Sequence, residues 1–301
     1  MSDTPALSRI ACLFTGLQRL YINLSTLGSG IPRGIAHNHV LEAIRVFPPL
    51  QYLRVRSLHS AKELHRILEC HGETLKGLII EPDIGLTRRD SLFRKSSLTF
   101  NVSDIHQLVQ ACPDLEELRV QIRKPTDDRH LGIYKTLGNF PKLKSLVLDL
   151  HYNPEPDSRI LIGVYGRLLL KNAPADKELA VKIWDLINSS HNAHLQHLRI
   201  VPFGIMHHKE TLRYCFGFLA PSFLATRSSN FDFPQPILEE IGDKERLIWM
   251  HEYPISREDG RSERNSDLDS DLVGLETMTV RSLFREMWPS APSTLAENGL
   301  F

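Results

Sequence analysis

A short pattern of hydrophobic and variable positions recurs six times in the first two thirds of the chain. Each copy reads Leu, two variable residues, Leu, one variable residue, and then Leu, Ile or Val. The copies lie at 17–22, 50–55, 75–80, 115–120, 143–148 and 195–200. Because the second Leu and the final aliphatic residue are separated by one position, each copy has the period of a strand buried on one face. The pattern therefore predicts six short strands.

Apolar residues at i, i+3 and i+4 spacing separate most of the copies and predict amphipathic helices. We expect these helices at 39–47, 61–71, 103–112, 130–137 and 176–188. Ser60 and Glu63 have the spacing of a capping box, which marks the start of the second helix. One strand cannot bury its apolar face alone, and a helix returns the chain between parallel strands. We predict an α/β fold: an irregular leucine-rich-repeat solenoid, with a curved parallel sheet on the concave side and helices on the convex side.

The uneven spacing of the copies suggests how the chain is divided. We expect the solenoid at 1–203, with an insertion at 151–175 that contains the turn signal Asn153-Pro-Glu-Pro156. Weaker strand patterns at 223–228 and 237–241, and a helical one at 244–252, indicate a C-terminal extension of the solenoid over 204–255. The polar stretch 256–271 is typical of an acidic flexible linker, and 272–301 of a terminal helix and tail.

Composition and charge favour an ordinary soluble chain. Hydrophobic residues make up 42% and charged residues 24%, and the formal net charge is zero. No stretch approaches the roughly 20 apolar residues that span a bilayer, and the N-terminus has no signal-peptide pattern. We therefore expect a cytoplasmic or nuclear protein without a membrane partner. The four cysteines, Cys12, Cys70, Cys112 and Cys215, have no metal or disulfide spacing, so we expect buried, reduced thiols.

The sequence contains no catalytic motif of the common kinds. There is no G-x-S-x-G elbow, no H-E-x-x-H and no G-x-x-x-x-G-K. Histidines gather at 191–197, but no cysteine or carboxylate accompanies them at a familiar ligand spacing. The aspartates at 267–271 lack the glycine and glutamate that a calcium loop requires. We predict no enzyme activity, no cofactor and no metal site.

The variable residues of each copy form the predicted recognition surface. They alternate with the buried positions and therefore point to the concave face, as do Ile79, Glu81, Val147 and Asp149. Tyr and Arg are common anchors of protein interfaces, so we predict binding of a protein partner. The candidate residues are Arg19, Tyr21, Tyr52, Arg54, Arg56, Glu117, Arg119, Gln121, His197 and Arg199.

Two hypotheses for this surface are open to test. If it binds a protein, charge reversal at Arg54 and Arg119 should abolish partner capture and leave the fold intact. The alternative is a nucleic-acid-binding solenoid that uses the basic N-terminal part of the concave face. Its affinity would fall steeply with added salt, because bound cations are released from the phosphate backbone.

Two of the copies resemble F-box/leucine-rich-repeat proteins, in particular the large, divergent fungal group. The matching phrases are Cys112-Pro-Asp-Leu-Glu-Glu-Leu118 and Phe140-Pro-Lys-Leu-Lys-Ser-Leu146. The helix at 176–187 and the late Phe284-Arg-Glu-Met-Trp-Pro289 are also similar to that group, and the repeat pattern covers about residues 10–203.

That resemblance implies a substrate receptor of a ubiquitin ligase, in which the repeats hold the substrate and an N-terminal F-box binds the cullin-linked adaptor. No Leu-Pro-x-Glu-Ile/Leu opening precedes the first copy, which begins at Leu17. We therefore carry over the substrate-receptor role as an expectation and do not expect the adaptor to bind. The pattern does not identify the partner.

Overall fold

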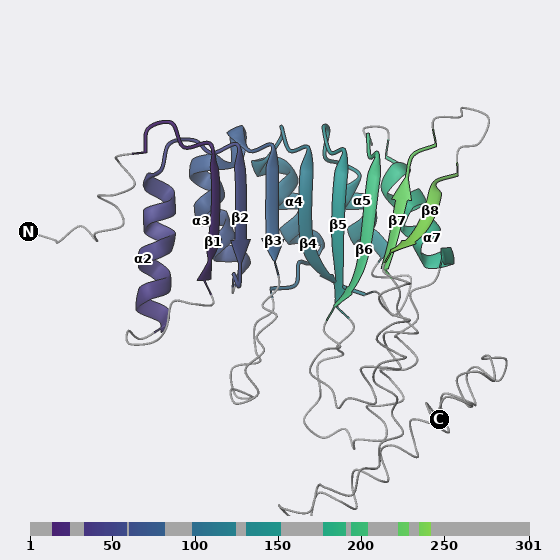
Figure 1. Cartoon of the computed structure of the whole chain (residues 1–301), viewed down its shortest axis with the longest axis horizontal. Coiled ribbons are helices and arrows are strands. Elements are labelled where there is room, and N and C mark those ends of the chain that lie inside the picture. The colour runs from purple at the N-terminus through teal and green to yellow at the C-terminus, as the bar shows by residue number, and fades with distance from the viewer. Residues whose placement is uncertain are drawn as a thin grey trace, which may run out of the picture. The chain divides into compact units, whose positions relative to one another are not determined.

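The computed structural model has an α/β fold built on one eight-stranded, mostly parallel sheet (Figure 1). It describes residues 14–24, 33–58, 60–81, 98–124, 131–151, 177–190, 194–203, 222–228 and 235–241. The strands follow one another across the sheet in sequence order. They are β1 (Arg19–Asn23), β2 (Tyr52–Arg56), β3 (Gly77–Glu81), β4 (Glu117–Arg123), β5 (Ser145–His151), β6 (His197–Phe203), β7 (Ser222–Thr226) and β8 (Ile237–Ile241). The six predicted strands and the two weaker ones are confirmed.

Equivalent leucines of the first five copies lie in one row across the sheet. Leu20 pairs with Leu53, Leu53 with Leu78, Leu78 with Leu118, and Leu118 with Leu146, all between parallel strands. From Leu53 onward these side chains are buried. Because side chains alternate along a strand, this shared register places every buried position of the copies on the same face of the sheet.

A backbone hydrogen-bond motif recurs where successive strands begin. The carbonyl of Gln18 accepts from the N–H groups of Gln51 at 2.9 Å and Tyr52 at 3.0 Å. The same double acceptance, each time toward the next copy, is made by the carbonyls of Gln51, Lys76, Glu116 and Lys144. Successive copies therefore enter the sheet with the same backbone geometry, although the loops between them differ in length.

The helices predicted between the copies are confirmed, although the first begins six residues earlier than predicted and the others differ by at most two residues at their ends. They are α2 (Arg33–Val46), α3 (Ala61–His71), α4 (Val102–Ala111), α5 (Gly132–Leu137) and α7 (Lys177–Asn188). The predicted capping box of α3 is present: the Glu63 N–H donates to Ser60 Oγ at 3.3 Å, and the Ser60 N–H to Glu63 Oε2 at 3.2 Å. Asn101 and Asp104 form a second capping box at the start of α4, which was not predicted from the sequence.

The core lies between the sheet and its helices. Helices α3, α4 and α5 lie behind the sheet in Figure 1, and neighbouring helices contact one another. Their buried residues, such as Ile67, Ile105 and Leu137, share this layer with the buried leucines of the strands. Burial of apolar side chains, worth about 25 cal/mol per Å², is the main stabilising contribution of such a layer.

The cysteine prediction is confirmed at one position and wrong at another. Cys112 is buried, and burial raises its thiol pKa to about 12, so it stays a protonated, packed side chain. Cys70 is exposed instead. The buried side of α3 contains Leu64, Ile67, Leu68 and His71, which leaves Cys70 on the outer side of the helix. The other two cysteines lie outside the described residues.

The chain divides into two compact units. The first comprises Met1–His151, Ala180–Val201 and Leu224–Leu238, and the second Tyr152–Leu179, Pro202–Phe223 and Glu239–Phe301. None of the helices that the structure describes is long and apolar enough to cross a membrane. The following predicted features lie outside the described residues: the insertion from residue 152 on, the helix at 244–252, the linker at 256–271, and the terminal segment at 272–301.

His71 is a buried polar residue that connects the end of α3 to two other segments. Only 1% of its surface is exposed. The Leu50 N–H donates to its Nδ1 at 3.4 Å, and its Nε2 lies 2.9 Å from the carbonyl oxygen of Ile44. These contacts fit a neutral ring that carries its proton on Nε2. Burial lowers the pKa of His71, and the hydrogen bond to Ile44 opposes this shift only in part.

We expect the free energy of unfolding to fall as the pH drops below about 6.5 because of His71. Its pKa is lower in the folded chain than in the unfolded one, so between these two values the unfolded chain binds more protons. The stabilisation is complete above the unfolded pKa and is lost as the pH falls toward the folded pKa. One proton contributes a slope of up to about 1.4 kcal/mol per pH unit. Urea denaturation between about pH 7.5 and pH 5.5 should show a shallower slope for His71→Gln than for the wild type; equal slopes would contradict this assignment.

Candidate interaction surface

One face of the sheet, turned toward the viewer in Figure 1, has no helix of the described residues over it. We call the outward-facing residues of β1 to β6 the open face. Its charged residues are six arginines and three acids: Arg19, Arg54, Arg56, Arg119, Arg123 and Arg199 with Glu81, Glu117 and Asp149. The open face therefore carries an excess of positive charge, although the formal net charge of the whole chain is zero.

The structure places all ten predicted surface residues at outward positions of strands β1, β2, β4 and β6. Nine of the ten are exposed or partly exposed. These nine are Arg19, Tyr21, Tyr52, Arg54, Arg56, Glu117, Arg119, His197 and Arg199. The strand period was therefore sufficient to place them on one face.

Gln121 is the exception, because only 2% of its surface is exposed. The expectation that its side chain is accessible on this surface is wrong. Ile79–Arg119 is the last register pair between β3 and β4, and the segment at Phe100 then bridges to Ile122 in place of β3. The Phe100 N–H donates to the Gln121 carbonyl at 2.9 Å, so this segment runs directly beside Gln121.

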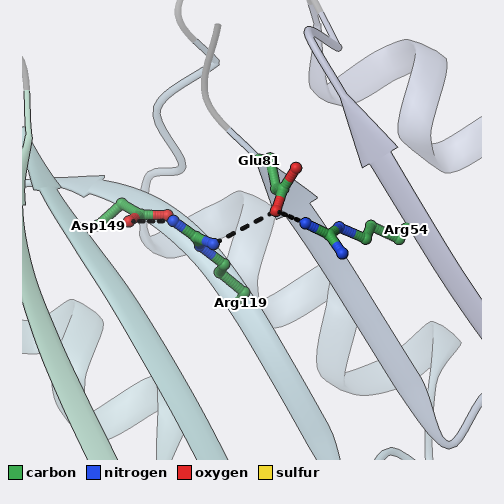
Figure 2. Close-up of polar contacts among 4 residues, drawn as sticks. All are labelled: Arg54, Glu81, Arg119 and Asp149. Carbon is green, nitrogen blue, oxygen red and sulfur yellow. Dashed lines mark hydrogen bonds and ion pairs between the residues drawn. The ribbon is translucent and has the colours of Figure 1, made fainter. Parts of the chain in front are cut away.

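Four charged residues from four successive strands form a continuous chain of ion pairs (Figure 2). Arg54 on β2 contacts Glu81 Oε1 on β3, and Arg119 Nη1 on β4 lies 3.4 Å from the same oxygen. Arg119 also donates from Nε and Nη2 to the two carboxylate oxygens of Asp149 on β5, at 2.8 and 3.0 Å. Such a two-point pair holds a guanidinium in a defined position and plane.

In this chain of ion pairs, the acidic side chains are recessed and the arginine side chains are accessible. The Arg54 side chain is 49% exposed, against 11% for Glu81. Arg119 is 28% exposed, whereas Asp149 is only 1% exposed. A molecule approaching the open face therefore meets guanidinium groups, while the carboxylates beneath them act as supports.

At the buried end of the ion-pair chain, the pKa values of Asp149 and Arg119 are both shifted. Burial raises the pKa of Asp149, and the hydrogen bonds and charge of Arg119 oppose that shift without cancelling it. Burial would lower the pKa of Arg119, but Asp149 and Glu81 outweigh it and raise this pKa. Arg119 is therefore a permanent cation that supports a buried carboxyl group. Charge reversal at Arg119 would place an acid beside buried Asp149, so from this geometry we expect that change to destabilise the fold.

Aromatic rings pair with arginines at the start of the sheet. Tyr21 and Arg54 are direct register partners, with the guanidinium carbon 4.7 Å from the ring centroid. Arg19 and Tyr52 form the reciprocal pair at 4.4 Å. Each contact is of the cation–π type, worth about 0.5–1 kcal/mol at an exposed site. Gly77 makes this arrangement possible, because a Cβ at that position would lie 2.4 Å from Tyr52 Cδ1.

Glu81 and Asp149 are the functional residues whose role sequence reasoning missed. Both were expected to point outward, but neither was expected to hold an arginine. One signal was available: arginine and acid alternate at outward positions of successive copies, in the order Arg54, Glu81, Arg119, Asp149. Opposite charges on neighbouring strands favour a ladder of pairs.

This surface presents positioned guanidinium groups beside aromatic rings, a combination that is chemically suited to anionic groups. Within the described part of the chain, no group of His, Cys, Asp and Glu side chains has the arrangement needed to hold a metal ion. Comparison with protein-family models, with curated proteins and with solved structures finds no match to this chain.

Proposed function

We propose that this chain is a leucine-rich-repeat solenoid that binds a protein partner on its open face. Two features support the solenoid. The first is the hydrogen-bond motif that recurs at five successive junctions, and the second is the parallel register that keeps equivalent leucines in one row. Stacked units of this kind bury a continuous core and leave a long surface for binding, which would be the concave face of the solenoid.

The observation that carries the binding proposal is the set of accessible Arg and Tyr side chains held in place by their neighbours. Arg54 is supported by Glu81 and Tyr21, and Arg119 by Asp149. Tyr21 itself remains 53% exposed. Arginine and tyrosine are enriched among residues that dominate interface energies, and side chains already ordered before binding lose less entropy in a complex.

The resemblance to F-box/leucine-rich-repeat proteins suggests the class of partner: a protein presented as the substrate of a ubiquitin ligase. The proposed setting is the cytoplasm or the nucleus. Binding of the cullin-linked adaptor is a separate activity, and the proposal assigns it to none of the described residues.

Protein is favoured over nucleic acid by the charges of the open face. Nucleic-acid affinity comes largely from cations that neutralise phosphates. Arg54 and Arg119 already pair with Glu81 and Asp149, so their charges are partly compensated. A surface of compensated guanidiniums is better suited to directional hydrogen bonds than to a phosphate backbone.

We expect the double change Arg19→Gln/Tyr21→Ala to reduce recovery of specific partners at least tenfold in affinity purification from cells. Each hot-spot residue contributes about 2 kcal/mol or more to an interface, which is about 30-fold in affinity. Both side chains are exposed, so thermal denaturation should show a folded protein. Lys135→Gln on the exposed side of α5 is the matched control and should retain every partner.

Two results would count against the proposal. The first is unchanged recovery of all partners by the double variant. The second is a recovered fraction dominated by RNA or DNA, with binding that disappears steeply between low and physiological salt.

A further inference from the structure

Three of the six arginines of the open face stand on alternate strands in one register row. Arg54 pairs with Ile79, Ile79 with Arg119, and Arg119 with Val147. The row therefore reads arginine, aliphatic, arginine, aliphatic from β2 to β5. Ile79 and Val147 are partly exposed, so they contribute apolar contact area between the guanidiniums.

Arg199 continues this row onto β6. The His197 N–H donates to the Lys144 carbonyl at 2.9 Å, as the Ser145 N–H donates to the Glu116 carbonyl at 3.0 Å. Strand β6 thus begins in the same way as β5, and Arg199, two residues further on, falls beside Val147. The charge of Arg199 also acts to lower the pKa of Asp149, which places the two groups near each other.

The spacing of the row sets the spacing of a complementary ligand. Neighbouring strands lie about 4.8 Å apart, so arginines on alternate strands are separated by about 10 Å. A polyproline II segment advances about 3.1 Å per residue with three residues per turn, so residues three apart lie on the same side and are separated by about 9.3 Å. Carboxylates three residues apart on such a segment would match consecutive arginines, and each could accept a hydrogen bond from a guanidinium.

We propose that the row Arg54, Arg119 and Arg199 binds an acidic segment of a partner protein in the polyproline II conformation, which crosses the strands and carries Asp or Glu at every third residue. This inference rests on the proposed function and deepens it, because it names the chemistry and spacing of the partner.

The recessed carboxylates explain why the spacing matters. Glu81 contacts both Arg54 and Arg119, and Asp149 contacts Arg119, so the guanidiniums cannot swing freely toward an arbitrary anion. An anion of the wrong spacing would approach Glu81 or Asp149 and be repelled. The row should therefore discriminate between acidic segments of equal charge.

The test is a fluorescence-anisotropy titration of the full chain with two labelled peptides of the same composition. One peptide carries three glutamates at every third position, separated by Ala, Val and Ser, and the other carries them consecutively. We expect the spaced peptide to bind at least tenfold more tightly. Arg54→Gln and Arg199→Gln should each weaken that binding severalfold, whereas Lys135→Gln on α5 should not change it. Arg119 is not substituted in this test, because its loss would leave the buried carboxyl group of Asp149 without its cation.

Each outcome bears on the inference. Equal affinity for the two peptides would overturn it, because binding would then report total charge alone. Tighter binding of a single-stranded RNA oligonucleotide than of the spaced peptide would overturn it in favour of nucleic acid. If neither peptide binds while partner recovery still depends on Arg19 and Tyr21, the inference fails and the proposed function stands. If partner recovery is also insensitive to those residues, both fail.

Discussion

Replacing Arg119 with methionine is expected to lower the free energy of unfolding by about 3–5 kcal/mol at pH 7. The change removes both hydrogen bonds to Asp149, at 2.8 and 3.0 Å, and leaves that carboxyl group buried without its cation. A buried carboxylate that loses its partner must either remain charged in a poorly solvated site or take up a proton. The double variant Arg119→Met/Asp149→Leu should recover most of the loss, because it removes the buried charge as well.

The matched control is Arg54→Met. Arg54 is 49% exposed, and its partner Glu81 keeps the contact with Arg119 at 3.4 Å, so we expect a loss of no more than about 1 kcal/mol. Urea denaturation of both variants gives the comparison. Equal losses for Arg54→Met and Arg119→Met would contradict the idea that Asp149 depends on its cation.

The penalty at Arg119→Met should shrink as the pH falls toward about 4. Burial already raises the pKa of Asp149 in the wild type, and removal of Arg119 takes away the interaction that opposes this shift. The folded variant therefore binds more protons than its unfolded chain in the window between the unfolded pKa and the raised folded pKa. Its cost is complete above the folded pKa and disappears below the unfolded one. A penalty that stays constant between pH 7 and about pH 4.5 would show that lost packing is responsible instead.

The second large effect is expected at Gly138, where alanine should lower the free energy of unfolding by about 3 kcal/mol. A Cβ there would lie 2.1 Å from the carbonyl oxygen of Ile187 and 3.1 Å from Cβ of Ser190. The carbonyl belongs to the backbone near the end of α7 and cannot rotate away, so α5 and α7 would have to separate. Gly138 has helical dihedral angles, with φ at −67°, so close approach is the reason for glycine here.

Gly132→Ala is the internal control for this prediction. Gly132 begins α5, the same helix that Gly138 ends, and a Cβ there would meet nothing nearer than Val102 Cγ2 at 4.0 Å. Alanine should therefore be neutral or stabilise by about 0.5–1 kcal/mol through its higher helix propensity. Thermal and urea denaturation should show a lower free energy of unfolding for Gly138→Ala and an unchanged or higher one for Gly132→Ala. A Gly138→Ala protein as stable as Gly132→Ala would disprove the close contact between α5 and α7.

The sequence by itself was sufficient to locate the described strands and helices and to assign the face of the sheet on which each strand residue lies. Copies such as Leu115–Val120 contain the two-residue period of a strand, and the capping box at Ser60 marks a helix start within four residues. These are local properties of the chain, set by backbone geometry and by the burial of nearby apolar side chains. They placed Arg54, Arg119 and Arg199 outward without any knowledge of neighbouring strands.

Only the tertiary structure decided which of those outward residues support one another and which are buried. Arg119 meets Asp149 because parallel register brings together residues that are 30 positions apart in the chain. Gln121 is buried at the level where β3 no longer pairs with β4 and the segment at Phe100 runs beside it. The ring nitrogens of His71 form hydrogen bonds with Leu50 and Ile44, which belong to other segments. Such pairings depend on the register and spacing of separate segments, which the alternation of side chains within a single strand does not encode.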